Sequence, residues 1–83
     1  DAREGREMDK NINKTFQVVG FNGPRTVCIK ERYFLGAGYK YPSYHCEVVS
    51  GSKHYPAGTQ ENFLERDIVK NGNLITSIRV LSA

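Results

Sequence analysis

The sequence predicts an all-β domain, built as a small five-stranded antiparallel barrel with one short helical or 3₁₀ turn. Five short segments are rich in aromatic and β-branched residues, which favour strands. Two Asn-Gly pairs, Asn22-Gly23 and Asn71-Gly72, are strong hairpin signals. Several short strands joined by turn signals are typical of a barrel. A chain of 83 residues is long enough for one domain with a modest core.

The first half of the chain contains a polar arm, two strands and an aromatic loop. Residues 1–13 are charged and without period, so we expect a disordered arm, or in part a remnant before a native start at Met8. The single domain then covers residues 14–83. Strands are expected over residues 16–21 and 25–34, with Val27 and Ile29 facing inward. The Gly- and Tyr-rich residues 36–43 are expected to form a loop.

The second half is expected to supply the remaining strands and the helical turn. A third strand is predicted over residues 44–50 and a short fourth strand over residues 53–55. Residues 59–64 open like a helix, with Thr59 as the N-cap. Residues 74–81 form the last predicted strand. The predicted core consists of ten apolar residues: Phe16, Val18, Val27, Ile29, Val48, Phe63, Leu64, Ile68, Ile78 and Val80.

This order of elements resembles an SH3-like barrel of the Tudor or KOW kind. The resemblance depends on the aromatic loop after the second strand and on Asn62-Phe63-Leu64, where those folds place a 3₁₀ turn. The chain also resembles small phage-encoded domains, which implies a nucleic-acid or phage–host context. The segments that carry this second likeness are Gly20-Phe21-Asn22, Val27-Cys28-Ile29-Lys30, Asn62-Phe63 and Ile68-Val69-Lys70-Asn71. The Tyr-rich insertion after the second strand departs from that pattern.

Charge and aromatic residues coincide in the middle of the chain. All five tyrosines lie between Lys30 and Tyr55, and residues 10–56 hold seven lysines and arginines against two glutamates. Rings set among cations can stack on bases and neutralise phosphates. We therefore predict a small basic module that binds nucleic acid, either DNA or RNA. The predicted contact residues are Arg25, Lys30, Arg32, Tyr39, Lys40, Tyr41, Tyr44, Lys53 and Tyr55.

Three alternatives stay open for the same residues. The first is a protein-binding adaptor or inhibitor that docks on a larger enzyme or complex, because tyrosine is enriched in such contacts. The second is a reader of methylated side chains, with Tyr33, Tyr39, Tyr41 and Phe63 as an aromatic cage. In the third, two or three of the rings simply wall the core.

The sequence offers no constellation for catalysis, so we predict that the protein is not an enzyme and needs no cofactor. Cys28, His45, Cys46 and His54 match no zinc-binding spacing, which argues against a metal site. Cys28 and Cys46 are expected to be unpaired, buried thiols. No apolar run is long enough to span a membrane, and we expect a cytoplasmic protein.

Overall fold

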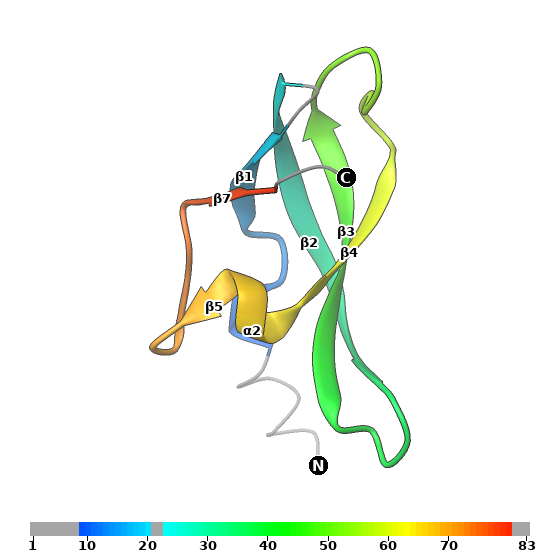
Figure 1. The fold of residues 1–83 in the computed structure, drawn as a ribbon, viewed down its shortest axis with the longest axis vertical. Coiled ribbons are helices and arrows are strands. Elements are labelled where there is room, and N and C mark those ends of the chain that lie inside the picture. The colour runs from blue at the N-terminus through cyan, green and yellow to red at the C-terminus, as the bar shows by residue number, and fades with distance from the viewer. Residues whose placement is uncertain (1–8, 21–22, 81–83) are drawn as a thin grey trace.

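The computed structural model describes residues 9–20 and 23–80, which form a strongly twisted sheet with a small helix–hairpin unit beside it (Figure 1). The main sheet has five strands in the order β4-β3-β2-β1-β7. Its strands are β1 (Thr15–Gly20), β2 (Gly23–Leu35), β3 (Tyr41–Ser50), β4 (Gln60–Leu64) and β7 (Ser77–Arg79). The other elements are the 3₁₀ turn η1 (Asp9–Asn11), the helix α2 (Glu65–Ile68), and the two-stranded sheet of β5 (Val69–Lys70) and β6 (Asn73–Leu74).

The all-β class is confirmed, but the sheet does not close into an antiparallel barrel over the described residues. Strands β1 to β4 pair antiparallel in chain order, whereas β7 runs parallel to β1. The strand orientations are therefore mixed, with β4 at one edge and β7 at the other. The cause is α2 with the β5–β6 hairpin, which carries the chain across from β4 to the far edge of the sheet (Figure 1).

The core lies between one face of this sheet and the segment that contains α2 and β6. Six of the ten predicted core residues are buried: Phe16, Val18, Val27, Ile29, Val48 and Ile68. The other four, Phe63, Leu64, Ile78 and Val80, are half-buried, and all but Leu64 pack against the buried cluster. The core also contains Tyr44, Cys46 and Cys28, and both cysteines are free thiols, as predicted.

The predicted helical turn over residues 59–64 does not form, and residues 60–64 are strand β4 instead. The hydroxyl of Thr59 donates to the carbonyl of Pro56 at 2.7 Å, so it closes the preceding turn instead of capping a helix. Residues 60–64 then pair with β3, and the helix begins one residue later, at Glu65. The predicted strand over residues 53–55 is a bend, and the last strand is shorter than predicted, at Ser77–Arg79.

Part of the predicted disordered arm is folded. Asn11 is 2% exposed and donates through Nδ2 to the Tyr44 hydroxyl at 3.4 Å. The N–H of Asn13 donates to the carbonyl of Ile29 at 2.8 Å. Residues 9–13 therefore pack against the sheet, and residues 1–8 of the predicted arm lie outside the described part of the chain.

Both predicted hairpins form. Strands β1 and β2 pair with Gly20 opposite Gly23, and the two residues between them lie outside the described residues. Asn71 and Gly72 connect β5 to β6 and have φ values of 54° and 81°. Two consecutive positive φ values are what the hairpin turn favoured by Asn-Gly requires.

Candidate interaction surface

Strands β2 and β3 extend beyond their neighbours as a two-stranded hairpin arm, which we define as residues 30–43. Strand β1 ends its pairing with β2 at Cys28, and β4 ends its pairing with β3 at Ser43. The arm projects from the body of the molecule, whose longest dimension is 40 Å (Figure 1). The predicted eight-residue loop is therefore shorter, a turn over residues 36–40 between two long strands.

The turn of the arm has a fixed geometry. Gly36 has a φ of 87°, and a Cβ atom on it would lie 2.6 Å from Cδ2 of Tyr41. Only glycine allows the Tyr41 ring to lie this close to the main chain. The N–H of Tyr39 donates to the carbonyl of Gly36 at 3.0 Å, and Tyr39 itself has a φ of 55°. The arm thus presents the Tyr39 side chain from a closed turn.

Large apolar side chains are exposed mainly on this arm. Exposed fractions are 42% for Phe34, 45% for Leu35, 76% for Tyr39 and 48% for Tyr41. Among the described residues, the only other large hydrophobic side chain in this class is Val49, at the opposite end of β3. A gathering of exposed apolar groups is the usual mark of a contact surface.

Arg25 and Tyr55, both predicted contact residues, are instead joined in an internal cluster. The Arg25 guanidinium donates to both carboxylate oxygens of Glu61, at 2.5 and 2.6 Å. Its Cζ lies 3.8 Å from the centroid of the Tyr55 ring, and Arg25 is 7% exposed. Hydrogen bonding to Glu61 raises the pKa of Arg25. The Arg25 guanidinium therefore already has a carboxylate partner and an aromatic partner inside the fold.

Arg32 and Tyr44 belong to a second internal network. Arg32 donates from Nε to Oε2 of Glu65 at 2.7 Å and from Nη2 to Oε1 at 3.3 Å. The Tyr44 hydroxyl donates to Oε2 of Glu65 at 2.9 Å, and Tyr44 is 1% exposed. The hydrogen bond from Arg32 lowers the pKa of Glu65, and desolvation raises the pKa of Tyr44. Tyr44 is thus a core residue and cannot stack on a base.

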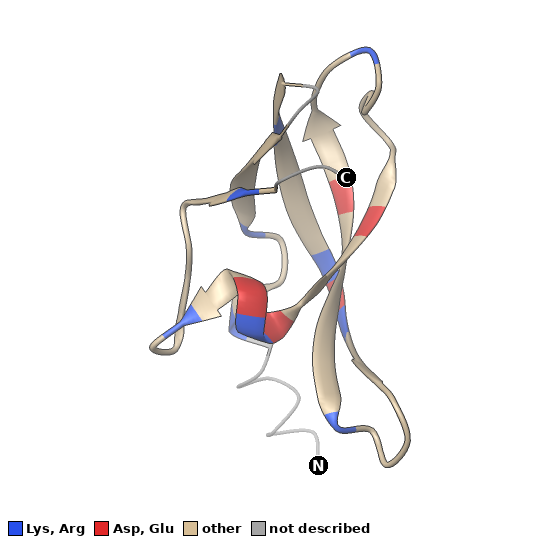
Figure 2. Cartoon of the chain, in the orientation of Figure 1, with Lys and Arg blue, Asp and Glu red and all other residues tan. Residues whose placement is uncertain are grey.

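The remaining predicted cations do not form one face. Lys30, Lys40 and Lys53 are exposed, but Lys53 lies in the loop between β3 and β4. That loop and the turn of the arm lie at opposite ends of the longest axis, and Figure 2 shows basic residues at both ends. Of the nine predicted contact residues, only Tyr39, Lys40 and Tyr41 lie together on an exposed surface; Lys30 lies at the base of the arm.

The predicted aromatic cage does not assemble. Phe63 lies opposite Tyr44 on the core side of the sheet and packs edge-on against Phe16, with ring centroids 5.4 Å apart. Tyr41 is an odd number of residues from Tyr44, so it faces the other side of the sheet. These rings therefore cannot surround one ligand.

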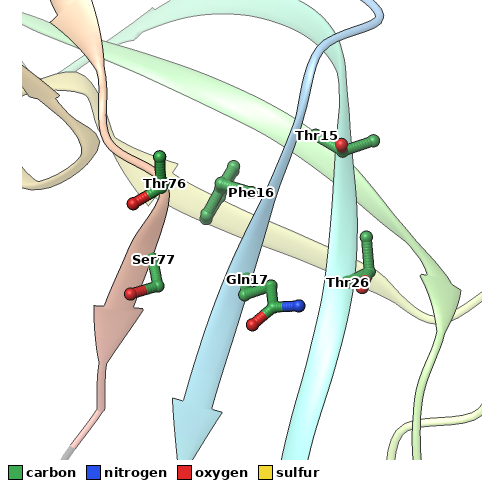
Figure 3. Close-up of a pocket in the computed structure, with 6 residues that line it drawn as sticks. All are labelled: Thr15, Phe16, Gln17, Thr26, Thr76 and Ser77. Carbon is green, nitrogen blue, oxygen red and sulfur yellow. The ribbon is translucent and has the colours of Figure 1, made fainter.

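A shallow groove crosses β7, β1 and β2, with a volume of about 450 Å³. Its lining is Thr15, Phe16, Gln17, Thr26, Thr76 and Ser77, with hydroxyl and amide groups at the surface (Figure 3). None of these side chains is charged or titrates near neutral pH. The lining therefore offers hydrogen bonds and contains no side chain suited to act as a general acid or base near neutral pH.

Two side chains with reactive potential, Cys46 and His45, are buried or hydrogen-bonded. Desolvation raises the pKa of the Cys46 thiol to about 12, which leaves it protonated and unreactive at neutral pH. Nδ1 of His45 lies 2.8 Å from Oδ1 of Asn62. Within residues 9–20 and 23–80, no three or more His, Cys, Asp and Glu side chains come together as a metal site would require.

Comparisons with known proteins found no matching family model, no matching curated protein and no matching solved structure. No helix in the part of the chain that the structure describes has the length and apolar character needed to cross a membrane.

Proposed function

We propose that this protein is a small protein-binding module, an adaptor or inhibitor that docks on a larger protein through the tip of its hairpin arm. The observation that carries the proposal is the exposed group of Phe34, Leu35, Tyr39 and Tyr41 at the end of the projecting arm, in and beside its closed turn. Aromatic anchors on a rigid element supply contact area with little loss of conformational entropy.

The cations weaken the nucleic-acid alternative relative to this proposal. Two of the five predicted phosphate ligands, Arg25 and Arg32, already have carboxylate partners in Glu61 and Glu65. A phosphate would have to compete with those carboxylates. Lys40 and Lys53 lie in turns at opposite ends of the molecule, so few cations are available near any one stacking ring.

Site-specific photo-crosslinking tests the proposal. We would place a photoreactive side chain at Leu35, which is 45% exposed, and in a control protein at Val49, which is 52% exposed. Both residues are aliphatic and lie on strands, so the two proteins differ mainly in the end of the molecule that carries the probe. Crosslinks to a discrete protein from position 35, and none from position 49, support the proposal. Equal crosslinking from both positions contradicts it.

Nucleic-acid binding is the second candidate, favoured by one feature of the tip. Exposed Lys40 stands between Tyr39 and Tyr41, an arrangement that suits one phosphate and two stacked bases. Titration with fluorescent single- and double-stranded oligonucleotides at two salt concentrations tests it. Lys40→Ala should then reduce the salt dependence by roughly one phosphate contact, and Tyr41→Ala should weaken binding by about 1–3 kcal/mol. No binding at low salt eliminates this candidate.

A further inference from the structure

The two edges of the hairpin arm differ in what they offer to another chain. On the β2 side, the main chain of residues 13–14 makes the last contacts, to Ile29, and beyond that point no strand of the described residues pairs with the outer edge of β2. On the β3 side, β4 continues to Ser43. Within residues 9–20 and 23–80, the last part of β2 is therefore an edge strand next to the exposed apolar tip.

The direction of the main-chain groups on this edge follows from Pro42. Phe34 lies opposite Pro42. Proline has no N–H to give to β2, so this pair belongs to the non-hydrogen-bonded class. The contacts of Val48 agree, because its N–H and C=O bond to Thr59 and Gly58 on the β4 side, as alternation from Pro42 requires. In a non-hydrogen-bonded pair the main-chain groups point away from the partner strand, so those of Phe34 point to the open edge.

The same proline closes the other edge. Beyond Ser43, the outer edge of β3 presents Pro42, which has no donor for an added strand. A further strand can therefore be added to the arm only on the β2 side, where Phe34 offers both a donor and an acceptor. Edge strands of this kind are templates for an added strand.

We propose that the partner segment is an extended, acidic peptide that adds as a strand along the outer edge of β2 and hydrogen-bonds to the main chain of Phe34. This inference rests on the proposed protein-binding function and specifies the partner and the mode of binding. Apolar side chains at alternate positions of the peptide would all lie on one face of the sheet, either beside Phe34 or beside Leu35, because these neighbouring residues of β2 face opposite sides.

We expect the peptide to be acidic because the exposed charges on the arm are mainly positive. Lys30 and Lys40 are exposed and make no ion pair among the described residues, and Glu31 is the only carboxylate on the arm. Pairing of two arms with each other would bring surfaces of the same sign together, which is destabilising. An acidic strand complements the arm, whereas a second copy of this chain does not.

Selection from a displayed library of random ten-residue peptides at low salt supplies the probe. We expect enriched peptides to be acidic, with apolar residues at every second position. Enrichment of basic, proline-rich or sequence-unrelated peptides would overturn the inference. The strongest binder is then synthesised and its dissociation constant measured for the wild-type protein and two variants at Phe34.

The two variants separate the side chain from the main-chain donor. Phe34→Ala removes the ring and keeps the N–H, while Phe34→Pro removes both and leaves the hydrogen bonds between β2 and β3 in place, because the Phe34 N–H points away from β3. We expect Phe34→Pro to bind at least about tenfold more weakly than Phe34→Ala, the loss of a hydrogen bond worth roughly 1.4 kcal/mol. Equal affinities would overturn the inference.

Amide hydrogen exchange of the wild-type protein gives a result that does not depend on how well the proline variant folds. Added peptide should slow exchange at Phe34 at least tenfold, and unchanged exchange there would overturn the strand-addition mode. Failure of the proposed function looks different: peptide binding would then be insensitive to Tyr41→Ala. If Tyr41→Ala weakens peptide binding but the peptide does not slow exchange at Phe34, the proposed docking tip is supported and only the strand-addition mode is overturned.

Discussion

The ion pair of Arg25 and Glu61 makes Glu61→Ala the most informative change to the fold. The side chains are only 6% and 13% exposed, and the guanidinium makes two hydrogen bonds to the carboxylate. Removal of Glu61 leaves a cation between the Tyr55 ring and the core with no counter-charge. Breaking a buried pair in this way costs about 3–5 kcal/mol. A domain of this length has a total stability of about 4–12 kcal/mol, so the variant should lie close to the unfolding threshold.

Urea unfolding measures this loss. The chain has no tryptophan, so tyrosine fluorescence and far-UV circular dichroism are the suitable signals. Glu31→Ala is the control, because Glu31 is exposed on the arm and its removal should change stability by less than about 0.5 kcal/mol. Replacing both partners, Arg25→Met with Glu61→Met, should recover most of the loss, since apolar pairs often replace buried ion pairs at no net cost. A loss below about 1 kcal/mol for Glu61→Ala would refute the reasoning, because that is the value of a solvent-exposed pair.

Three other predictions follow from the site. Hydrogen bonding to Arg32 lowers the pKa of Glu65. The ionised Glu65 side chain therefore stabilises the fold above the ordinary glutamate pKa of 4.5, and this stabilisation is lost as the pH falls through the lowered pKa. Glu65→Gln should flatten the acid side of a stability–pH curve measured in urea. Gly36→Ala should cost about 1–3 kcal/mol and displace the Tyr41 ring, which two-dimensional NMR of the aromatic protons would detect. The Cys46 thiol should resist iodoacetamide in the native protein, whereas unfolding without reductant should allow two labels per chain, and fewer than two would indicate a disulfide.

Local sequence patterns predicted the strands and hairpins well where tertiary contacts agree with them. Alternation in residues 25–34 placed Val27 and Ile29 in the core, and Asn71-Gly72 forms the expected turn. Residues 59–64 were assigned wrongly because a threonine followed by polar residues resembles a helix start. Pairing with β3 decided the outcome, and β-structure depends more on such neighbours than on intrinsic preference.

The barrel prediction failed for a related reason. Counting strands and turns gives the number of elements, but not the path that α2 and the β5–β6 hairpin impose between β4 and β7. That path delivers β7 to β1 in parallel orientation. The segment at residues 9–13 also gave no signal in its composition. It is ordered by Asn11, whose side chain reaches Tyr44, 33 residues further along the chain.

The candidate surface could be predicted only in part, because charge counted along a sequence does not show which charges remain available after folding. Arg25 and Arg32 lie in the basic stretch of residues 10–56. Their partners, Glu61 and Glu65, lie 36 and 33 residues away, in residues 57–83, where basic and acidic residues balance. Folding therefore neutralises the centre of the predicted basic face and leaves isolated lysines at its ends. The rings behave in the opposite way: Tyr44 and Tyr55 are drawn into these two networks, whereas Tyr39 and Tyr41 stay exposed beyond the reach of the core. What remains exposed at the end of the arm is an apolar tip with Lys40 beside it, and the proposed protein-binding function depends on this surface.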